Sequence, residues 1–302
     1  MSCSRIAACP AGPDFSRFAM GYWRLMDWGL TTHQLIAFIE QGLALGITTV
    51  DHADIYGGYR VERCFGEALA QAPGLRERLE IVTKCGIGLV SPERPDHRIK
   101  HYDTSRDHIL ASVDRSLANL QTDFIDLLLI HRPDPLLDAD QVAEAFQTLH
   151  TAGKVRWFGV SNFNPHQFAL LQDRLPFPLV TNQLEISPYQ LAPFFDGSLD
   201  LCQRRRISPM AWSCLGGGRL FSGEDPCSQR LRQVLGEEGA AVGCSLEQLV
   251  YAWVMAHPSR PLPLIGSGRI DRVRHALESE QIVLDRQAWF HILQAAAGAE
   301  VP

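Results

Sequence analysis

The sequence predicts an α/β fold, a (β/α)8 TIM barrel with an additional C-terminal helix. Short apolar runs rich in valine and isoleucine alternate along the chain with amphipathic stretches, and strands that are apolar on both faces are typical of a parallel sheet covered by helices. The length of 302 residues suits one barrel, since such barrels run to about 250 residues or more. A doubly wound sheet would favour a Gly-x-Gly-x-x-Gly motif after an early strand, and none follows one here.

The predicted strands are short, and most are almost continuously apolar. Each is followed by a segment that is long enough for a helix or a loop, as the alternating fold requires. We expect the eight strands at residues 17–25, 48–53, 80–85, 124–131, 155–160, 179–186, 207–212 and 261–265.

The predicted helices carry apolar residues at helical spacing. We expect them at residues 32–45, 105–120, 140–151, 165–171, 245–256, 269–279 and 285–297, the last of them beyond the eighth strand. Capping residues support their ends: Thr31 or Thr32 would cap the first helix and Gly46 would end it. Asn164 followed by Pro165 is a cap with proline at the first helical position.

The chain reads as a single domain over residues 1–302. It has no internal repeat, no serine-rich linker and no run of like charges. Two connections, residues 86–104 and 215–228, are long for a compact domain, and loops of this length are often functional. We expect them to act as lids over an active site.

Composition excludes several classes of protein. The net charge is −6, whereas nucleic-acid-binding proteins usually carry a basic surplus. No run approaches the roughly 20 apolar residues of a membrane span. The eight cysteines form no Cys-x-x-Cys pair and no cluster with zinc spacing, which favours reduced thiols in a cytoplasmic protein. We therefore expect no nucleic-acid partner, no membrane span and no bound metal.

Active sites of such barrels lie at the carboxyl ends of the strands, and three predicted strands carry reactive residues there. Lys84 ends an otherwise apolar strand, where an unpaired ammonium would be very costly. Asp51, on the neighbouring strand, is its natural partner. A nearby lysine would lower the pKa of Tyr56 from about 10 and make it a proton donor. His131 could hydrogen-bond the substrate or this phenol, so the four residues predict a proton-donating site that needs no metal.

Each of these residues also has a structural interpretation. The Asp–Lys pair could serve stability alone, Tyr56 could be a loop aromatic, and His131 could be a satisfied core histidine. A metal-dependent hydrolase is another alternative, with His52, Asp54 and His131 as ligands, although no second histidine lies at the usual ligand spacing. The occurrence of all four residues at successive strand ends favours the proton-donating site.

The motifs around these residues resemble those of the aldo-keto reductases. The resemblance extends from Gly21 to Arg269 and is closest to a bacterial subgroup of oxidoreductases. It is carried by Asp51-xxxx-Tyr56-Gly57-Gly58, Val82-Thr83-Lys84, Asp126-Leu-Leu-Leu-Ile-His131, Gly153-Lys154-Val155-Arg156, Gly159-Val160-Ser161-Asn162-Phe163 and Asn182-Gln183.

The resemblance implies an NADPH-dependent oxidoreductase that reduces aldehyde or ketone carbonyls of small molecules to alcohols. Tyr56 would protonate the carbonyl oxygen as hydride arrives from the nicotinamide. Lys84, held by Asp51, would depress the pKa of Tyr56, and His131 would orient the carbonyl.

The resemblance also implies where NADP(H) binds. Short polar side chains would hold the nicotinamide carboxamide, an aromatic ring would stack on the nicotinamide, a glycine-rich loop would wrap the pyrophosphate, and a serine and arginines at a helix start would bind the 2′-phosphate. The expected cofactor-binding residues are Gly21, Tyr22, Trp23, Ser161, Asn162, Gln183, Trp212, Ser213, Cys214, Leu215, Gly216, Gly218, Arg219, Ile265, Gly266, Ser267, Arg269 and Arg272.

The chain departs from the family pattern at a few positions. Many members have lysine where Gly266 stands, and others carry Glu and Asn where this chain has His275 and Ala276, which weakens the expected preference for NADPH. Arg132 replaces a tryptophan that is common after the catalytic histidine. The loop at 86–104 carries several cations that indicate an acidic or phosphorylated substrate, although ordinary surface charge explains them too; they are Arg94, Arg98, Lys100 and His101.

A regulatory protein is the main alternative from another functional class. Potassium-channel β-subunits are similar to the family, keep the cofactor site and act through a partner with little turnover. They carry an N-terminal inactivating segment or a channel-docking surface, and few residues precede the first predicted strand here. The sequence leaves the oligomeric state open, and a monomer is compatible with it.

Overall fold

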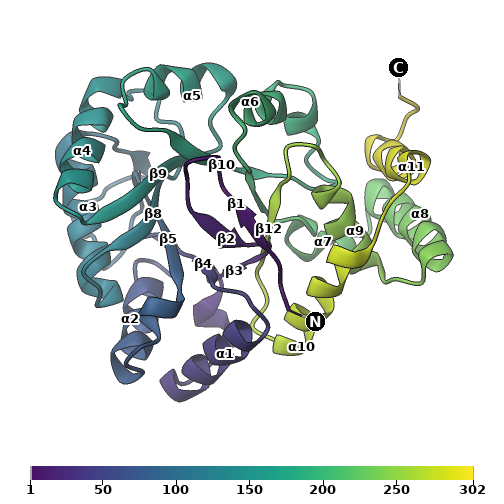
Figure 1. Ribbon diagram of the computed structural model, residues 1–302, viewed down its shortest axis with the longest axis horizontal. Helices are drawn as coiled ribbons and strands as arrows, with labels where there is room; N and C mark the ends of the chain where they lie inside the picture. The colour runs from purple at the N-terminus through teal and green to yellow at the C-terminus, as the bar shows by residue number, and fades with distance from the viewer. Residues whose placement is uncertain (1, 302) are drawn as a thin grey trace.

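The structure is a computed structural model that describes residues 2–301, and a closed barrel of eight parallel strands forms its centre (Figure 1). Each barrel strand pairs with the next one in chain order, and the last pairs with the first. The barrel strands are β3 (Ala19–Gly21), β4 (Thr49–Asp51), β5 (Glu80–Cys85), β8 (Ile125–Ile130), β9 (Val155–Ser161), β10 (Leu179–Glu185), β11 (Met210–Trp212) and β12 (Leu262–Ile265). The predicted fold class is confirmed.

Each of the eight predicted strands overlaps a barrel strand, and the burial of these strands explains why the sequence indicated them. All six residues of β8 are buried, so both faces of this strand must be apolar. The first strand is shorter than expected, because the chain leaves the barrel after Gly21. It continues into a 3-10 helix, η1 (Leu25–Trp28), which ends at Gly29 with φ 64°. The expectation of a strand through residue 25 is therefore wrong.

The seven predicted helices are present, with ends within one or two residues of the predicted ends. Thr31, Asn164 and Ser245 each form a capping box, in which the cap side chain and a glutamine three residues later satisfy each other's backbone N–H groups. These helices are α1 (Thr32–Ala44), α3 (Arg106–Leu120), α4 (Ala139–Thr151), α5 (Pro165–Gln172), α9 (Leu246–Met255), α10 (Ile270–Leu277) and α11 (Arg286–Ala297).

Four further helices were not predicted: α2 (Val61–Gln71), α6 (Ser198–Arg205), α7 (Arg219–Ser222) and α8 (Pro226–Val242). The connection at 215–228 is therefore not an open lid, because it contains the 3-10 turn η4 (Gly216–Gly218), α7 and the start of α8. Three more 3-10 turns are η2 (Arg76–Arg78), η3 (Ala192–Phe194) and η5 (Glu278–Gln281).

The connection at 86–104 is folded back on itself. Its ends form a small antiparallel pair, β6 (Ile87–Gly88) with β7 (His101–Tyr102), and Ser91 pairs with Arg94 between them. The backbone N–H of Asp103 donates to the carbonyl of Gly86 at 3.1 Å, at the base of this pair. The loop thus rises from the carboxyl end of β5 as one unit.

An N-terminal hairpin, β1 (Arg5–Ala7) and β2 (Asp14–Ser16), lies against the amino ends of the barrel strands. In Figure 1 these two strands cross the middle of the barrel ring. The N–H of Ser16 donates to the hydroxyl of Thr49 at 3.0 Å, and the Arg5 guanidinium lies 2.7 Å from the Glu80 carboxylate. The hairpin closes the end of the barrel opposite to the predicted active site, and we call it the floor hairpin.

The predicted C-terminal helix, α11, packs beside α8 at one edge of the barrel (Figure 1). Trp253 in α9 stacks on Trp289 in α11 at 5.1 Å between ring centroids, and each indole N–H donates to the other residue's backbone carbonyl at 3.0 Å. Within residues 2–301, no helix combines the length and the apolar character that a membrane span requires.

Candidate active site

Asp51, Tyr56, Lys84 and His131 meet at the carboxyl end of the barrel, as the sequence predicts. Asp51 is the last residue of β4, Lys84 lies near the end of β5, and His131 directly follows β8. The Lys84 ammonium donates to both Asp51 carboxylate oxygens at 2.7 and 2.8 Å and to the Tyr56 hydroxyl at 3.0 Å. The Tyr56 and His131 rings meet edge to face, with centroids 5.9 Å apart.

Lys84 is one of the largest fully buried side chains of the described chain. A buried ammonium is tolerated only with good partners, and here the carbonyl of His52 adds a third acceptor at 2.7 Å. Burial lowers the pKa of Lys84, but the negative Asp51 carboxylate and the Tyr56 hydroxyl outweigh burial and raise that pKa above its ordinary value. Lys84 is therefore a fixed positive charge beside the Tyr56 hydroxyl.

The Tyr56 hydroxyl differs from the sequence-based expectation. Burial raises the pKa of Tyr56 above its ordinary value, and the positive charge of Lys84 offsets only part of that effect. The expectation that Lys84 brings this pKa below 10 is therefore wrong for the protein alone. The phenol keeps its proton at neutral pH, which is the form that a proton donor requires.

His131 is neutral at physiological pH. Burial, followed by the positive charges of Lys84, Arg132 and Lys100, lowers the pKa of His131 well below its ordinary value. Its Nδ1 atom is buried and has no hydrogen-bond partner among the described residues. A neutral imidazole with a free nitrogen can donate to or accept from a polar group of a substrate.

The residues expected at the nicotinamide carboxamide form one hydrogen-bonded row across β9, β10 and β11. The Trp212 indole donates to the Asn162 side-chain oxygen at 3.2 Å, and the Asn162 amide donates to the Ser161 hydroxyl at 2.7 Å. The Gln183 amide donates to the Asp51 carboxylate at 2.7 Å. Gln183 is thus bound to the Asp51 carboxylate that also holds Lys84, a contact that the sequence did not indicate.

The expected pyrophosphate loop follows β11. Gly216, Gly217 and Gly218 have φ values of 60°, 66° and 102°, a conformation that favours glycine. A Cβ atom on Gly216 would lie 2.4 Å from the Tyr189 ring, whereas one on Gly218 would meet nothing within 4 Å. The Arg219 guanidinium stacks on Tyr189 at 4.6 Å and forms an ion pair with Asp225. The backbone of the loop is therefore exposed to a ligand, but Arg219 is engaged.

The expected 2′-phosphate residues lie at the start of α10. Arg269 is the N-cap residue and forms an ion pair with Asp271 one residue into the helix, while the Ser267 hydroxyl accepts from the N–H of Arg269 at 3.3 Å. Arg272 is exposed and has no ion pair among the described residues. Gly266 is exposed beside them. Of the two expected arginines, Arg272 alone is free of a carboxylate partner.

The remaining expected cofactor residues differ in exposure. Tyr22 is fully buried and stacks on His52 at 4.9 Å, whereas Trp23 is 57% exposed. Cys214 is buried, and burial raises its pKa to about 12. The others are Gly21, Ser213, Leu215 and Ile265, of which Gly21 and Ile265 are buried at strand ends. Because Tyr22 and Cys214 are buried, a cofactor could contact only their backbone atoms or the edge of the side chain. The cofactor-binding roles of all these residues stay predictions.

The metal-site alternative finds no ligand cluster. His52 lies between Tyr22 and Phe65, and burial lowers its pKa to about 3. Across residues 2–301, no three His, Cys, Asp or Glu side chains are grouped so that they could hold a metal ion.

The sequence did not predict that two carboxyl groups are buried together close to Lys84. Asp54 and Glu62 are both buried, and the Thr83 hydroxyl donates to Glu62 at 2.6 Å. Burial raises the pKa of both groups, and the charge of Glu62 raises that of Asp54 further. Thr83 precedes Lys84, so the pair packs against the strand that carries the lysine.

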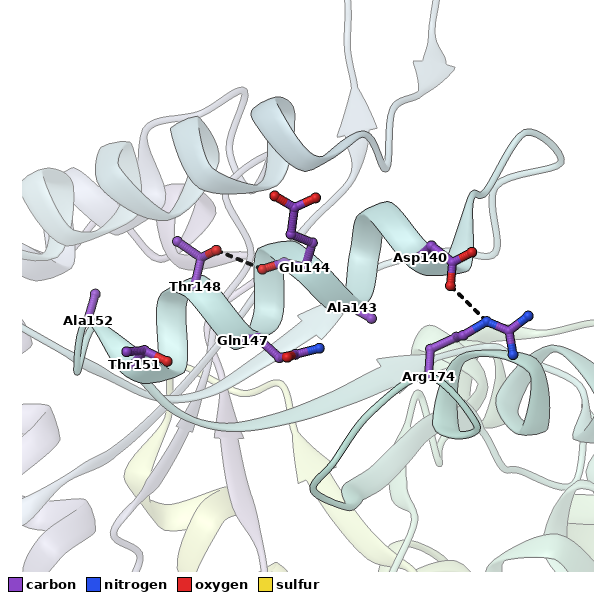
Figure 2. A pocket seen from close by; sticks show the side chains of 8 residues that line it. All are labelled: Asp140, Ala143, Glu144, Gln147, Thr148, Thr151, Ala152 and Arg174. Atoms are coloured by element: carbon purple, nitrogen blue, oxygen red, sulfur yellow. Dashed lines mark hydrogen bonds and ion pairs between the residues drawn. The ribbon is translucent and has the colours of Figure 1, made fainter.

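One groove on the described surface lies away from these four residues. It measures about 660 Å³ and runs along the outer face of α4 toward Arg174 (Figure 2). Figure 2 shows two of its side chains, Asp140 and Arg174, paired at 2.8 Å. The groove is lined by none of the candidate site residues that the sequence indicated, so the chemistry points to the barrel mouth instead.

Comparisons with known proteins agree with this geometry. The model of the "Aldo/keto reductase family" matches residues 17–296. Oxidoreductase YdhF of Escherichia coli is 60% identical over 300 residues, which cover 99% of both chains. A 6-dehydroglucose reductase of Agrobacterium fabrum is 45% identical, with 95% of this chain and 96% of the other covered. A thermostable aldo-keto reductase solved with the inhibitor epalrestat shares the fold, with TM-score 0.80, 24% identity and coverage of 97% and 99%.

Proposed function

Because the chain belongs to the aldo/keto reductase family, we propose that it is an NADPH-dependent oxidoreductase that reduces the carbonyl group of an aldehyde or ketone to an alcohol. The contact of the Lys84 ammonium with both Asp51 and the Tyr56 hydroxyl carries this proposal. It places a proton-bearing phenol beside a buried positive charge at the carboxyl end of the barrel.

The four residues divide the work as follows. A reduced nicotinamide held by these residues would supply the hydride for the carbonyl carbon. Tyr56 gives its proton to the carbonyl oxygen, and Lys84 stabilises the phenolate that remains until solvent reprotonates it. Asp51 keeps Lys84 charged and in place, while neutral His131, whose ring meets that of Tyr56 edge to face, positions the carbonyl oxygen. The net change is one carbonyl, one hydride and one proton converted to one alcohol.

The residues of this chain fit a nicotinamide dinucleotide. Three successive glycines with positive φ form a stretch of backbone without side chains that a pyrophosphate can approach closely, and Trp212 offers a ring at the adjacent strand end. Ser161 and Asn162 would turn toward the carboxamide, and Gln183 would bind it only by sharing or leaving Asp51. Ser267, Arg269 and Arg272 would take the 2′-phosphate of NADP(H), with Arg272 as the arginine without a competing carboxylate.

Replacement of Tyr56 by phenylalanine tests the proposal. We expect Tyr56→Phe to lower kcat for carbonyl reduction about 10²- to 10⁴-fold, because it removes the general acid. NADPH binding, followed by the quenching of tryptophan fluorescence, should persist. Wild-type turnover of the variant at saturating NADPH would contradict the assignment. Parallel assays with NADH test the cofactor preference separately.

Steady-state turnover also separates the enzyme from the regulatory alternative. A protein that resembles potassium-channel β-subunits would oxidise one bound cofactor slowly and then stop. Under the proposed function we expect continued consumption of NADPH with a reducible aldehyde, whereas a single slow oxidation would favour the regulatory protein.

Further features of the proposal concern the setting of the enzyme. The Agrobacterium relative is named a 6-dehydroglucose reductase, so a sugar aldehyde belongs in the panel of small-molecule substrates.

Eight free thiols support a cytoplasmic location. We also infer one domain for the whole chain, because the barrel strands run from Ala19 to Ile265 and the family match spans nearly the same residues.

A further inference from the structure

The cations at the barrel mouth are not equivalent. Of the four that the sequence singled out in the 86–104 loop, Arg94 stacks on the Tyr59 ring at 4.4 Å and donates to the carbonyl of Glu93. His101 is bonded to the carbonyl of Ile99 through its Nδ1 atom. Only Lys100 lies near enough to affect the titration of His131, and it does so together with Arg132 from the end of β8.

Arg132 is held in place without being neutralised. It directly follows His131, and its guanidinium lies 5.3 Å from the centroid of the Trp212 ring. A guanidinium stacked on an aromatic face keeps its N–H groups free at its edge. Neither Arg132 nor Lys100 forms an ion pair or a side-chain hydrogen bond within residues 2–301, whereas Arg94 and Arg219 do form polar contacts.

The negative groups nearby do not balance this charge. Asp51 is committed to Lys84 and Gln183. Glu185 lies close enough for Arg132 to lower its pKa against the larger, opposite effect of burial, but the two side chains form no ion pair. Arg132, next to His131 in the chain, and Lys100 are therefore two positive charges without a carboxylate partner in the described chain, and both act on the imidazole.

We propose that the substrate carries an anionic group, a carboxylate or a phosphate, and that Arg132 binds this group while Lys100 assists. The inference rests on the proposed carbonyl reduction and specifies its substrate class. Arg132 would act as a specificity-determining residue, since an arginine edge binds a carboxylate or phosphate through two parallel hydrogen bonds. The stacked position on Trp212 fixes the direction from which the anionic group approaches His131.

Matched pairs of aldehydes test the inference. The first pair is 4-oxobutanoate and butanal, and the second is glyceraldehyde 3-phosphate and glyceraldehyde, each assayed with the NADPH-loaded enzyme. We expect a higher kcat/KM for the anionic member of at least one pair, and the pair that shows it identifies the anionic group. A preference for neutral members in both pairs, or for 6-dehydroglucose over all four, overturns the inference.

Variants locate the effect. Arg132→Gln should lower the ratio of anionic to neutral kcat/KM about 10- to 100-fold, as expected for a lost charge-assisted bidentate contact, with most of the change in KM. Arg132→Lys should retain part of the ratio, and Lys100→Gln should lower it less than Arg132→Gln does. Arg98→Gln is the matched control, because Arg98 is an exposed cation of the same loop without an ion pair in the described chain.

The outcomes separate the two proposals. An unchanged ratio in Arg132→Gln, or an equal fall in Arg98→Gln, overturns the role of Arg132 and leaves carbonyl reduction intact. If the wild-type enzyme reduces none of the aldehydes with either nicotinamide, the proposed function fails and this inference fails with it. Thermal denaturation of each variant checks that it is folded.

Discussion

Asp54, which lies between Asp51 and Tyr56 in the chain, has a carboxyl group that the fold shields from water. Its Oδ1 atom is buried without a hydrogen-bond partner among the described residues. Burial and the negative charge of Glu62 raise the pKa of Asp54 well above its ordinary value, although Arg115 and Arg94 oppose this in part. The folded protein therefore holds a proton on Asp54 at pH values where the unfolded chain has released it.

This raised pKa makes stability depend on pH. Because the folded state binds more protons than the unfolded state above the unfolded pKa of about 3.9, the contribution of Asp54 to stability falls as pH rises toward the folded pKa. In the Asp54→Asn variant this loss of stability with rising pH is absent. We expect the Tm of the variant, relative to wild type, to be higher at pH 8 than at pH 5, measured by calorimetry or circular dichroism.

Asp96→Asn is the control, since Asp96 is exposed in the 86–104 loop. Its Tm difference from wild type should be the same at both pH values. A flat difference for Asp54→Asn as well would mean that the Asp54 carboxyl is ionised in the folded protein.

At the scale of residues, the sequence indicated which residues form the candidate site but not all of the contacts between their side chains. Asp51, Tyr56, Lys84 and His131 could be predicted because each ends or follows a recognisable strand. The bond from Gln183 to Asp51 could not be, because it joins side chains 132 residues apart and depends on their rotamers. The direction of the Tyr56 pKa depends on how completely the site is buried, which sequence motifs do not report.

At the scale of elements, α2 and α3 approach each other closely at Gly66. A Cβ atom at this position would lie 2.0 Å from the backbone carbonyl oxygen of Asn119. Backbone cannot yield as a flexible side chain does, so the two helices would have to separate. Glu62 of the buried carboxyl pair belongs to α2, and it accepts a hydrogen bond from Thr83 beside Lys84. The close approach of the two helices therefore also fixes the position of Glu62 against the strand that carries Lys84.

We expect Gly66→Ala to destabilise the protein by about 1–3 kcal/mol through overpacking, measured by urea denaturation. Gly236→Ala in α8 is the matched comparison, because nothing lies within 4 Å of the added Cβ and the site is exposed inside a helix. That variant should gain about 0.5–1 kcal/mol of stability. Equal effects of the two changes would contradict the close approach of α2 and α3.

Most of the elements that the sequence did not indicate lack a local sequence signal, although α8 has one. Arg60, the N-cap residue of helix α2, makes no side-chain cap, and the helix contains Gly66 in its middle. Helix α6 starts after Gly197, again without a side-chain cap. Helix α8 did carry a signal, since Asp225 caps it and Pro226 takes its first position. The floor hairpin has strands of three residues, too short for an alternating pattern.

For the molecule as a whole, the solvent exposure of the eight cysteines shows which parts of the fold are closed to solvent. Cys3, Cys9, Cys85, Cys202 and Cys214 are buried, while Cys64, Cys227 and Cys244 are partly exposed, and all eight are free thiols. Burial raises the pKa of Cys3, Cys202 and Cys214 to about 12, so their reactive thiolate forms are scarce at neutral pH.

A thiol-reactive dye such as Ellman's reagent should therefore label at most three cysteines rapidly in the native protein and all eight after denaturation. Cys85 and Cys214, which lie beside the active-site strands, belong to the slow group. Rapid modification of more than three thiols under native conditions would show that the barrel opens more readily than its packing indicates. Serine substitution of Cys64, Cys227 and Cys244 identifies the fast sites.

The floor hairpin has a practical consequence for anyone who handles this protein. It sits at the end of the barrel away from Tyr56 and His131, and the first described residues enter from that side, where the N–H of Cys3 bonds to the carbonyl of Leu45. A bead, an electrode or a fused fluorescent reporter joined through the amino terminus would leave the opposite face turned toward the bulk solution. In an immobilised reactor or sensor built in that orientation, small molecules reach the barrel mouth without obstruction.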